Sequence, residues 1–336
     1  MESPDPIKGL LDTKGYVVLD GALATELESR GCDISDSLWS CKALMESPEL
    51  IRQVHYDYYV AGADIAITSS YQASPLGLAE QRNISESDAK ILIKKSVQLA
   101  QEARQQASRT LKKAETSMLV AGSVGPYGAY LADGSEYRGD YGSTVSREVL
   151  KAFHRPRISA LLAAGADCLA CETIPSFPEV EALSQLLSDE FPSAWAWFSF
   201  TVRDSLHLSD GTPLDKVCQT LGLNKKVMAV GINCVARDET TDLLNVLHDY
   251  WRGPLLAYPN SGELWDAKAR KWTEANKTPS ISGEPNGSLV TCVREWVRAG
   301  AKIVGGCCRT GPEDVRTIAQ TLISMKEVGS DESALT

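Results

Sequence analysis

Short apolar runs alternate with longer amphipathic segments along most of the chain. Apolar runs rich in β-branched residues predict eight strands, at residues 16–20, 64–68, 118–122, 168–171, 195–202, 227–231, 255–258 and 302–305. Apolar positions with helical spacing predict helices between them, at residues 48–61, 85–107, 145–164, 178–187, 240–250 and 287–299. Strands that alternate with helices usually pair in parallel. Eight such units would close a (β/α)8 barrel, although an open doubly wound sheet would give a similar pattern.

The connections between the predicted units carry a repeated signal and two long segments. Gly62, Gly165 and Gly300 each stand between two alanines just before a predicted strand, where glycine fits a left-handed helix C-cap. Longer segments follow the third and seventh strands, at residues 123–142 and 261–286. These are the strand ends at which barrel active sites are built. We therefore predict one domain over residues 1–328, followed by a polar, disordered tail at residues 329–336.

Composition and charge argue against several classes of protein. The 336 residues are 43% hydrophobic and 23% charged, which are ordinary values for a folded globular chain. A net charge of −10, with no dense basic block, makes nucleic acid an unfavourable partner. No apolar run is long enough for a membrane helix, and the N-terminus lacks the layout of a secretory signal. The nine cysteines are scattered and odd in number, which indicates reduced thiols and a cytoplasmic location.

Three cysteines follow predicted strands at what would be one mouth of the barrel. Cys307 and Cys308 come directly after the eighth strand, and Cys234 comes after the sixth. Because adjacent strand residues point to opposite faces, Cys307 and Cys308 could bind one ion only where the backbone bends, as Gly305 and Gly306 permit. Three thiolates leave one position open on a tetrahedral zinc ion, which is typical of a catalytic site. We expect zinc there to activate a substrate thiol.

The other cysteines and the histidines give weaker signals. Vicinal cysteines alone favour simple burial or a redox pair; the preceding Gly305 and Gly306, together with Cys234 at an equivalent strand end, favour a metal. Cys168 and Cys171 have the spacing of a redox motif, but they lie within an apolar strand, which favours burial. No site signal surrounds the remaining cysteines and histidines, which are Cys32, Cys41, Cys218, Cys292, His55, His154, His207 and His248. We interpret these side chains as structural.

Seven motifs are spread over the chain from about residue 17 to residue 318. They are DGALATE at 20–26, LWS at 38–40, TSSYQA at 68–73, GPYGAYL at 125–131, CET at 171–173, GINC at 231–234 and GGCCRT at 305–310. Together they resemble the homocysteine S-methyltransferase family, and within it the enzymes that use S-methylmethionine as methyl donor. The resemblance implies a (β/α)8 barrel, zinc on Cys234, Cys307 and Cys308, and homocysteine as the methyl acceptor.

The resemblance also implies how homocysteine is bound. Family members hold its amino group with the acid at the position of Glu172, helped by the aspartate–glycine turn at Asp20 and Gly21. From the residues alone, Glu172 could be an ordinary loop carboxylate, and Asp20 could cap a helix that starts near Gly21. Both acids follow predicted strands, as a binding site at the barrel mouth requires.

A sulfonium donor would need a site that accepts a soft cation. Aromatic faces attract such a charge by roughly 0.5–2 kcal/mol, although aromatic residues beside a barrel mouth can equally pack against loops. The candidate substrate-binding residues of this kind, with one neighbouring serine, are Trp39, Ser40, Tyr71, Tyr127 and Tyr130. The acidic segment at residues 133–140 could contact the amino-acid end of the donor or act as a lid.

Other donors and another class of protein remain open. S-adenosylmethionine is a second sulfonium donor, and the GPYGAYL motif resembles the users of betaine less than those of S-methylmethionine. The sequence has no Gly-x-Gly-x-x-Gly after a strand, which is the motif typical of nucleotide-binding methyltransferases. A non-catalytic zinc or redox sensor could use the same cysteines, but Asp20, Glu172 and Trp39 would then have no role. We expect homocysteine and S-methylmethionine as partners, no nucleic acid or membrane, and a monomer or small homo-oligomer.

Overall fold

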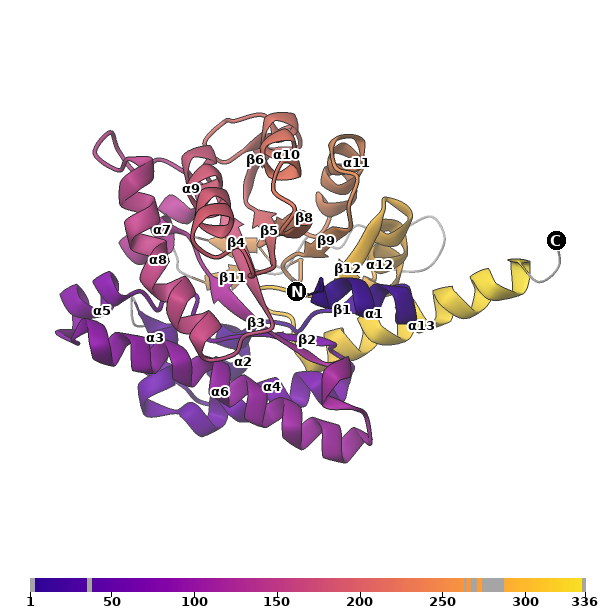
Figure 1. Ribbon diagram of the computed structural model, residues 1–336. Helices are drawn as coiled ribbons and strands as arrows, with labels where there is room; N and C mark the ends of the chain where they lie inside the picture. The colour runs from indigo at the N-terminus through magenta and orange to yellow at the C-terminus, as the bar shows by residue number, and fades with distance from the viewer. Residues whose placement is uncertain (1–3, 35–37, 263, 267–270, 274–286, 334–336) are drawn as a thin grey trace.

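A barrel of eight parallel strands lies at the centre of the molecule (Figure 1). The computed structural model describes residues 4–34, 38–262, 264–266, 271–273 and 287–333. The strands follow the order β1-β12-β9-β8-β5-β4-β3-β2 around the sheet. Their bounds are β1 Val17–Val18, β2 Ile65–Ile67, β3 Leu119–Val124, β4 Cys168–Ile174, β5 Ala196–Phe200, β8 Val227–Asn233, β9 Leu255–Tyr258 and β12 Ala301–Val304. A parallel bridge between Leu19 and Ile65 joins the two ends of this order, so the predicted (β/α)8 barrel is confirmed.

Helices surround the barrel (Figure 1). Their bounds are α1 Pro6–Lys14, α2 Leu23–Ser29, α3 Trp39–Glu46, α4 Pro48–Ala61, α5 Pro75–Arg82, α6 Glu86–Leu111, α7 Tyr127–Leu131, α8 Arg147–Ala163, α9 Phe177–Asp189, α10 Leu214–Gly222, α11 Thr240–Tyr250, α12 Leu289–Arg298 and α13 Pro312–Ser333, with 3-10 turns η1 Glu115–Ser117 and η2 Ser135–Tyr137. The six predicted helices are all present. Gly62, Gly165 and Gly300 have φ values of 121°, 84° and 104°, as helix-ending glycines require.

Two small antiparallel hairpins stand outside the barrel sheet. The fifth predicted strand is divided, because β5 ends at Phe200 and the chain then forms β6 Val202–Asp204, which pairs with β7 His207–Leu208. The second hairpin pairs β10 Leu264–Asp266 with β11 Lys271–Thr273, and residues 274–286 of the same long connection lie outside the described part of the chain. Both hairpins therefore belong to connections that follow barrel strands.

The core has two layers, one inside the barrel and one between the sheet and its helices. Inside, Cys168 and Trp197 lie in a cluster that also includes Ile7 of α1, so the first helix packs against the interior of the barrel. Cys171 belongs to the outer layer. The two cysteines of the Cys-x-x-Cys spacing are thus fully buried on opposite faces of β4, where they cannot act as a redox pair.

The last helix, α13, continues to Ser333. It therefore takes in residues 329–333 of the segment that the sequence predicts to be a disordered tail, and residues 334–336 lie outside the described part of the chain. Among the described residues, no helix combines the length and the apolar composition that crossing a membrane would demand.

Gly231 marks the closest approach of two strands that lead into the barrel mouth. A Cβ atom at this position of β8 would overlap the carbonyl oxygen of Leu256 in β9. Gly231→Ala should therefore lower the free energy of unfolding by about 2–3 kcal/mol, because the strands would have to separate. Gly222→Ala is the matched control, since its new Cβ would have its nearest neighbour at 4.0 Å. Chemical denaturation should show no loss for the control, and equal stability of the two variants would contradict the close approach.

Candidate active site

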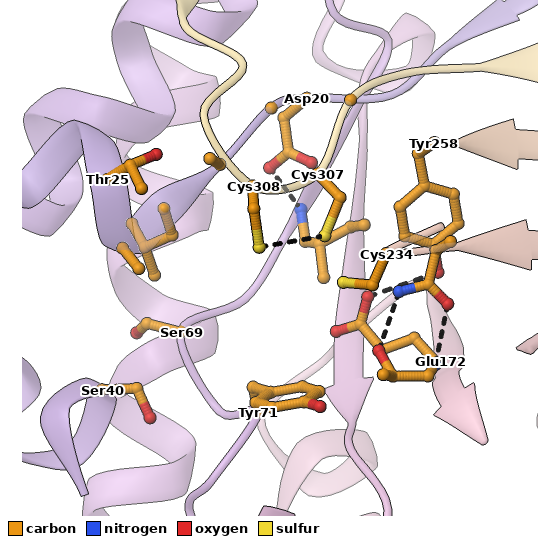
Figure 2. A pocket seen from close by; sticks show the side chains of 18 of the residues that line it. Asp20, Thr25, Ser40, Ser69, Tyr71, Glu172, Cys234, Tyr258, Cys307 and Cys308 are labelled. Carbon is orange, nitrogen blue, oxygen red and sulfur yellow. Dashed lines mark hydrogen bonds between the residues drawn. The ribbon is translucent and has the colours of Figure 1, made fainter. Parts of the chain in front are cut away.

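A cavity of about 250 Å³ lies at the carboxyl ends of the barrel strands (Figure 2). Its walls come from the residues that follow β1, β2, β8 and β12, from the ends of β4 and β9, and from η2. The residues predicted for the site that line it are Asp20, Gly21, Ser40, Tyr71, Glu172, Cys234, Cys307 and Cys308. The barrel therefore brings together side chains that are up to 288 positions apart in sequence, from Asp20 to Cys308.

The three cysteines form a compact group of thiols. Cys234 follows β8 directly, Cys307 and Cys308 lie in the loop after β12, and all three sulfur atoms are within 4.8 Å of one another. Within the described residues this is the one group of three or more side chains that could hold a metal ion. The Cys307 and Cys308 sulfurs are 4.0 Å apart. Tetrahedral zinc with Zn–S bonds of about 2.3 Å needs sulfurs about 3.8 Å apart, so the spacing fits a metal and is far too long for a disulfide.

The backbone bends after β12, which lets Cys307 and Cys308 approach each other. Neither Gly305 nor Gly306 has a positive φ; instead Arg309 does, at 65°. The two glycines are needed for close packing, because a Cβ on Gly305 would lie 2.5 Å from the Cβ of Leu19, and one on Gly306 would overlap the side chain of Thr310. The strand has already ended at Val304, so both cysteines belong to a loop and the alternation of strand residues does not separate them.

Hydrogen bonds among the three thiols shift the pKa values of Cys308 and Cys234 in opposite directions. Hydrogen bonds from Cys234 and then Cys307 hold the pKa of Cys308 well below its usual range. The pKa of Cys234 is raised, first by its hydrogen bonds with Cys307 and Cys308 and then by burial. One thiol therefore ionises readily and the others donate to it. A divalent ion would stabilise all three in the thiolate form.

Strained backbone lies near the thiols at the ends of two barrel strands, β4 and β8. Cys234 has a φ of 52° and Thr173 a φ of 61°, which is rare for a residue other than glycine and most unusual for a β-branched one. The side chain of Asn233 holds Thr173 in place, since it accepts from the Thr173 N–H at 2.8 Å and donates to its hydroxyl at 2.7 Å. Strain of this kind, with surrounding bonds that maintain it, is typical of functional sites.

Asp20 is buried at the mouth of the barrel with no basic partner among the described residues. Its carboxylate accepts a hydrogen bond of 2.8 Å from the N–H of Ile67, and it does not cap α2, which starts at Leu23 after the N-cap residue Ala22. Burial raises the pKa of Asp20 well above its usual range, and the nearby charge of Glu172 raises it further. The helix-capping interpretation of Asp20 is therefore wrong.

Glu172 lies in β4 and points into the same space as the cysteines (Figure 2). Its carboxylate accepts hydrogen bonds from the hydroxyl of Ser123 and, at 3.3 Å, from that of Tyr258. Burial raises its pKa to about 7 despite these two bonds. Glu172 is therefore not an ordinary loop carboxylate, because its burial without a basic partner among the described residues favours a cationic ligand.

Comparison of the sequence with known proteins shows to which family the chain belongs. The model of the homocysteine S-methyltransferase family matches residues 17–322. The homocysteine S-methyltransferase of Escherichia coli is 54% identical over 95% of this chain and 99% of its own, and a homocysteine S-methyltransferase of Bacillus subtilis is 47% identical over 96% and 99%. The chain belongs to the homocysteine S-methyltransferase family. The metallated form of the Escherichia coli enzyme superposes with a TM-score of 0.83 at 52% identity, covering 94% of this chain and 99% of that one.

The predicted aromatic residues of this methyltransferase occupy different places. Tyr71 lines the cavity, and burial, followed by the charge of Cys234, raises its pKa well above the usual range. Tyr127 and Tyr130 do not line it; their rings pack together at 5.2 Å and against Phe153 at 4.9 and 5.6 Å. Trp39 begins α3, next to Ser40 in the cavity wall, and its side chain lies outside the described part of the structure.

A buried charge network supports the segment that carries Tyr71. Arg157 donates to the carbonyl oxygens of Tyr71, at 3.0 Å, and Gly125, and to Nδ1 of His154 at 2.8 Å. Because a guanidinium group has no acceptor, Nδ1 must accept, and Nε2 of a neutral His154 donates to Glu179 at 2.7 Å. Burial lowers the pKa of His154, in agreement with the neutral form. His154 is structural, as the sequence predicts, and supports the cavity wall.

Several residues of the enzyme's site were not singled out from the sequence. Ser123 and Tyr258 bind Glu172, and Asn233 and Thr173 bind each other. Asn233 stands in the GINC motif and Thr173 in the CET motif, and the signal that could have found Tyr258 is its place as the last residue of a barrel strand. That is where barrel enzymes carry their working side chains.

Proposed function

We propose that this enzyme transfers a methyl group from the sulfonium amino acid S-methyl-L-methionine to L-homocysteine, and that Cys234, Cys307 and Cys308 hold a zinc ion for the reaction. The observation that carries the proposal is the convergence of three thiols in a cavity that also contains buried carboxylates. Thiolates suit a soft divalent ion, and carboxylates suit the ammonium groups of amino acids. The metallated form of the Escherichia coli relative supports a metal site in the family.

Cys234, Cys307 and Cys308 would hold this ion. Bound zinc would keep the thiol of homocysteine in the reactive thiolate form at neutral pH, where a free thiol with a pKa of about 8.5 is mostly protonated. Backbone hydrogen bonds hold all three cysteines: the N–H of Cys307 donates to the carbonyl of Pro259 at 2.8 Å, that of Cys234 to the carbonyl of Tyr258 at 3.4 Å, and the carbonyl of Cys308 accepts from the N–H of Ser261 at 3.0 Å. A cytoplasmic location would keep the ligands reduced.

Glu172 and Asp20 would bind the ammonium group of homocysteine. Each is buried, with no salt bridge to a basic side chain among the described residues, so an ammonium ion would supply the missing positive charge. Gly21 lets the turn after Asp20 pack closely against Thr310, since a Cβ there would lie 2.6 Å from the carbonyl oxygen of Thr310. This arrangement would direct the homocysteine side chain towards the three cysteines, which share the cavity with both acids (Figure 2).

The transfer itself would be a direct displacement at the methyl carbon. The homocysteine sulfur forms a bond to the methyl group, the bond between that carbon and the donor sulfur breaks, and its electron pair stays on the donor as a neutral thioether. No proton moves in this step, so no general base is required, and the residues contribute mainly by holding two amino acids with their sulfurs in line. Tyr71 would face the sulfonium ion. The charge of Cys234 contributes to the raised pKa of the Tyr71 hydroxyl, after burial.

Charge favours a sulfonium amino acid as the donor. Among the described residues that line the cavity there is no lysine, arginine or histidine, and the acidic ones are Asp20, Glu136 and Glu172. S-methylmethionine carries a net charge of +1 and betaine carries none, so the cavity favours the former. S-adenosylmethionine is the second candidate, and its adenosyl group is harder to place in about 250 Å³.

Product labelling tests the proposal directly. Because S-methylmethionine and homocysteine would both become methionine, the reduced, zinc-loaded enzyme should receive a deuterated methyl donor and homocysteine with ¹³C in its carbon chain. Methionine that carries both labels, detected by mass spectrometry and lost when the metal is stripped, is the expected result. Parallel reactions with S-adenosylmethionine and betaine rank the donors. Doubly labelled product from betaine alone would reject the sulfonium donor, and product from stripped enzyme would reject the metal.

A further inference from the structure

One carboxylate in the cavity wall is not used by the contacts described so far. Glu136 lies in η2, in the long connection that follows β3, and its Oε2 atom is buried without a hydrogen-bond partner in the described structure. Arg138, two residues further along the chain, donates to the Asp133 carbonyl at 3.1 Å and to the Ser135 hydroxyl at 3.3 Å. Burying a carboxylate oxygen without a partner is unfavourable, so its presence in a cavity indicates a cationic ligand.

The position of Glu136 is fixed by its surroundings. Its carbonyl oxygen accepts a hydrogen bond of 2.9 Å from the hydroxyl of Thr201, which follows β5. Gly128 packs so closely against this turn that a Cβ atom there would overlap the backbone nitrogen of Glu136. The turn begins with a further bond of 2.9 Å, from the Ser135 N–H to the Asp133 carboxylate. The carboxylate is therefore presented to the cavity from a well-packed turn.

Tyr71 connects the position of Glu136 with that of the thiols. Tyr71, Glu136 and Cys234 line the same cavity, and Tyr71 follows β2, whereas Glu136 belongs to η2. Glu172 and Asp20, the carboxylates assigned above to homocysteine, come from the barrel strands and the residues that follow them, whereas Glu136 comes from a connection above the barrel. A sulfonium ion near Tyr71 could therefore have its amino-acid end at Glu136. In S-methylmethionine three carbon atoms separate the sulfur from the amino nitrogen.

We propose that Glu136 binds the α-ammonium group of the methyl donor and so selects sulfonium compounds that carry an amino-acid end. The inference rests on the proposed function, because the methyl donor is one of the two substrates of that reaction. Glu136 would be the carboxylate that binds it. Each amino acid would then have a separate acidic contact: homocysteine at Glu172 and Asp20, and the donor at Glu136. Donors without an amino group would gain nothing from Glu136.

The test compares two donors in two variants of the zinc-loaded enzyme. Glu136→Gln keeps the shape of the side chain, and Glu115→Gln, in η1 before β3, is the exposed control. The donors are S-methylmethionine and its analogue without the amino group, (3-carboxypropyl)dimethylsulfonium. Glu136→Gln should lower kcat/KM for S-methylmethionine by roughly 10- to 100-fold through the donor KM, with the KM for homocysteine and the zinc content unchanged. The analogue should react equally with all three proteins.

Calorimetric binding of S-methylmethionine to the same proteins separates this inference from the proposed function. Weaker binding to Glu136→Gln than to the wild type supports the inference even if no methyl transfer is seen. Methyl transfer by the wild type with no change in Glu136→Gln, or an equal loss for both donors, would overturn it and leave the proposed function standing. Absence of binding to the wild type would overturn both. Glu136→Asp, which retains the charge on a shorter side chain, should show an intermediate donor KM.

Discussion

Cys307→Ser should release the bound metal and lower methyl transfer by more than about 1,000-fold. A serine hydroxyl does not ionise near neutral pH and is a poor ligand for a soft divalent ion, so two thiols would remain where three are needed. Loss of a residue that merely supports a metal ligand already costs roughly 10- to 100-fold in affinity or activity, and loss of the ligand itself should cost more. Metal content by mass spectrometry and methionine formation should be measured on the same purified sample.

Cys168→Ser is the matched control for this substitution. Cys168 is fully buried, but it lies inside the barrel in β4 and does not line the cavity. The control should retain the metal and the activity, with some loss of stability from the buried hydroxyl. A Cys307→Ser protein with full metal content and normal turnover would mean that the ion is bound by other residues.

Much of the fold could be predicted from periodicity alone. Helices α4 and α11 have the predicted bounds, because their apolar stripes begin and end sharply, and all eight barrel strands coincide with apolar runs. Closure could not be predicted from the pattern, since it depends on contacts between distant segments: the N–H of Leu19 donates to Val304, and that of Asp20 to Ile65. Short helices such as α3, α5 and α10 were missed because fewer than three turns give little periodicity.

The candidate site was predictable where a residue's place along a strand decides its role. Asp20, Glu172 and the three cysteines all lie at or just after strand ends, and parallel strands bring those ends together. The sequence identified Glu136 only as part of the acidic segment at residues 133–140. It does not show which carboxylate of that segment lines the cavity. That choice is made by tertiary contacts such as the one between Gly128 and the turn.

A residue's place in a motif does not predict the direction of its side chain when the residue belongs to a short helix. Tyr127 and Tyr130 belong to a motif that follows β3, yet α7 places them against Phe153 and away from the cavity. We therefore leave both tyrosines out of the proposed donor site and retain Tyr71. The chain does bend after Val304, but Gly305 and Gly306 serve there in close packing against Leu19 and Thr310, for which there was no signal in the sequence.

Glu172→Gln should lower kcat/KM for homocysteine by about 100- to 1,000-fold, because the homocysteine ammonium group would lose its buried anionic partner. The donor KM and the metal content should stay close to the wild-type values, since Glu172 does not belong to the group of cysteines that could hold a metal ion. In the wild type, protonation of Glu172 should have the same consequence as the substitution. With a pKa of about 7, the KM for homocysteine should rise as the pH falls below 7, and this rise should be absent from the variant.

The same substitution should stabilise the metal-free protein, in a pH-dependent way. The pKa of Glu172 is raised from 4.5 to about 7 in the folded state, so the folded protein binds this proton more tightly than the unfolded chain does. The free energy of unfolding of the wild type therefore falls as the pH rises from 4.5 to 7. Above pH 7 the cost of the buried charge is fully present, on the order of 3 kcal/mol, and Gln removes it; below pH 4.5 the two proteins should be equally stable. Denaturation at pH 4 and pH 8 measures this difference. A variant that is less stable than the wild type at pH 8 would mean that the Ser123 and Tyr258 hydrogen bonds outweigh the burial of the charge, and that Glu172 is retained for structure more than for binding.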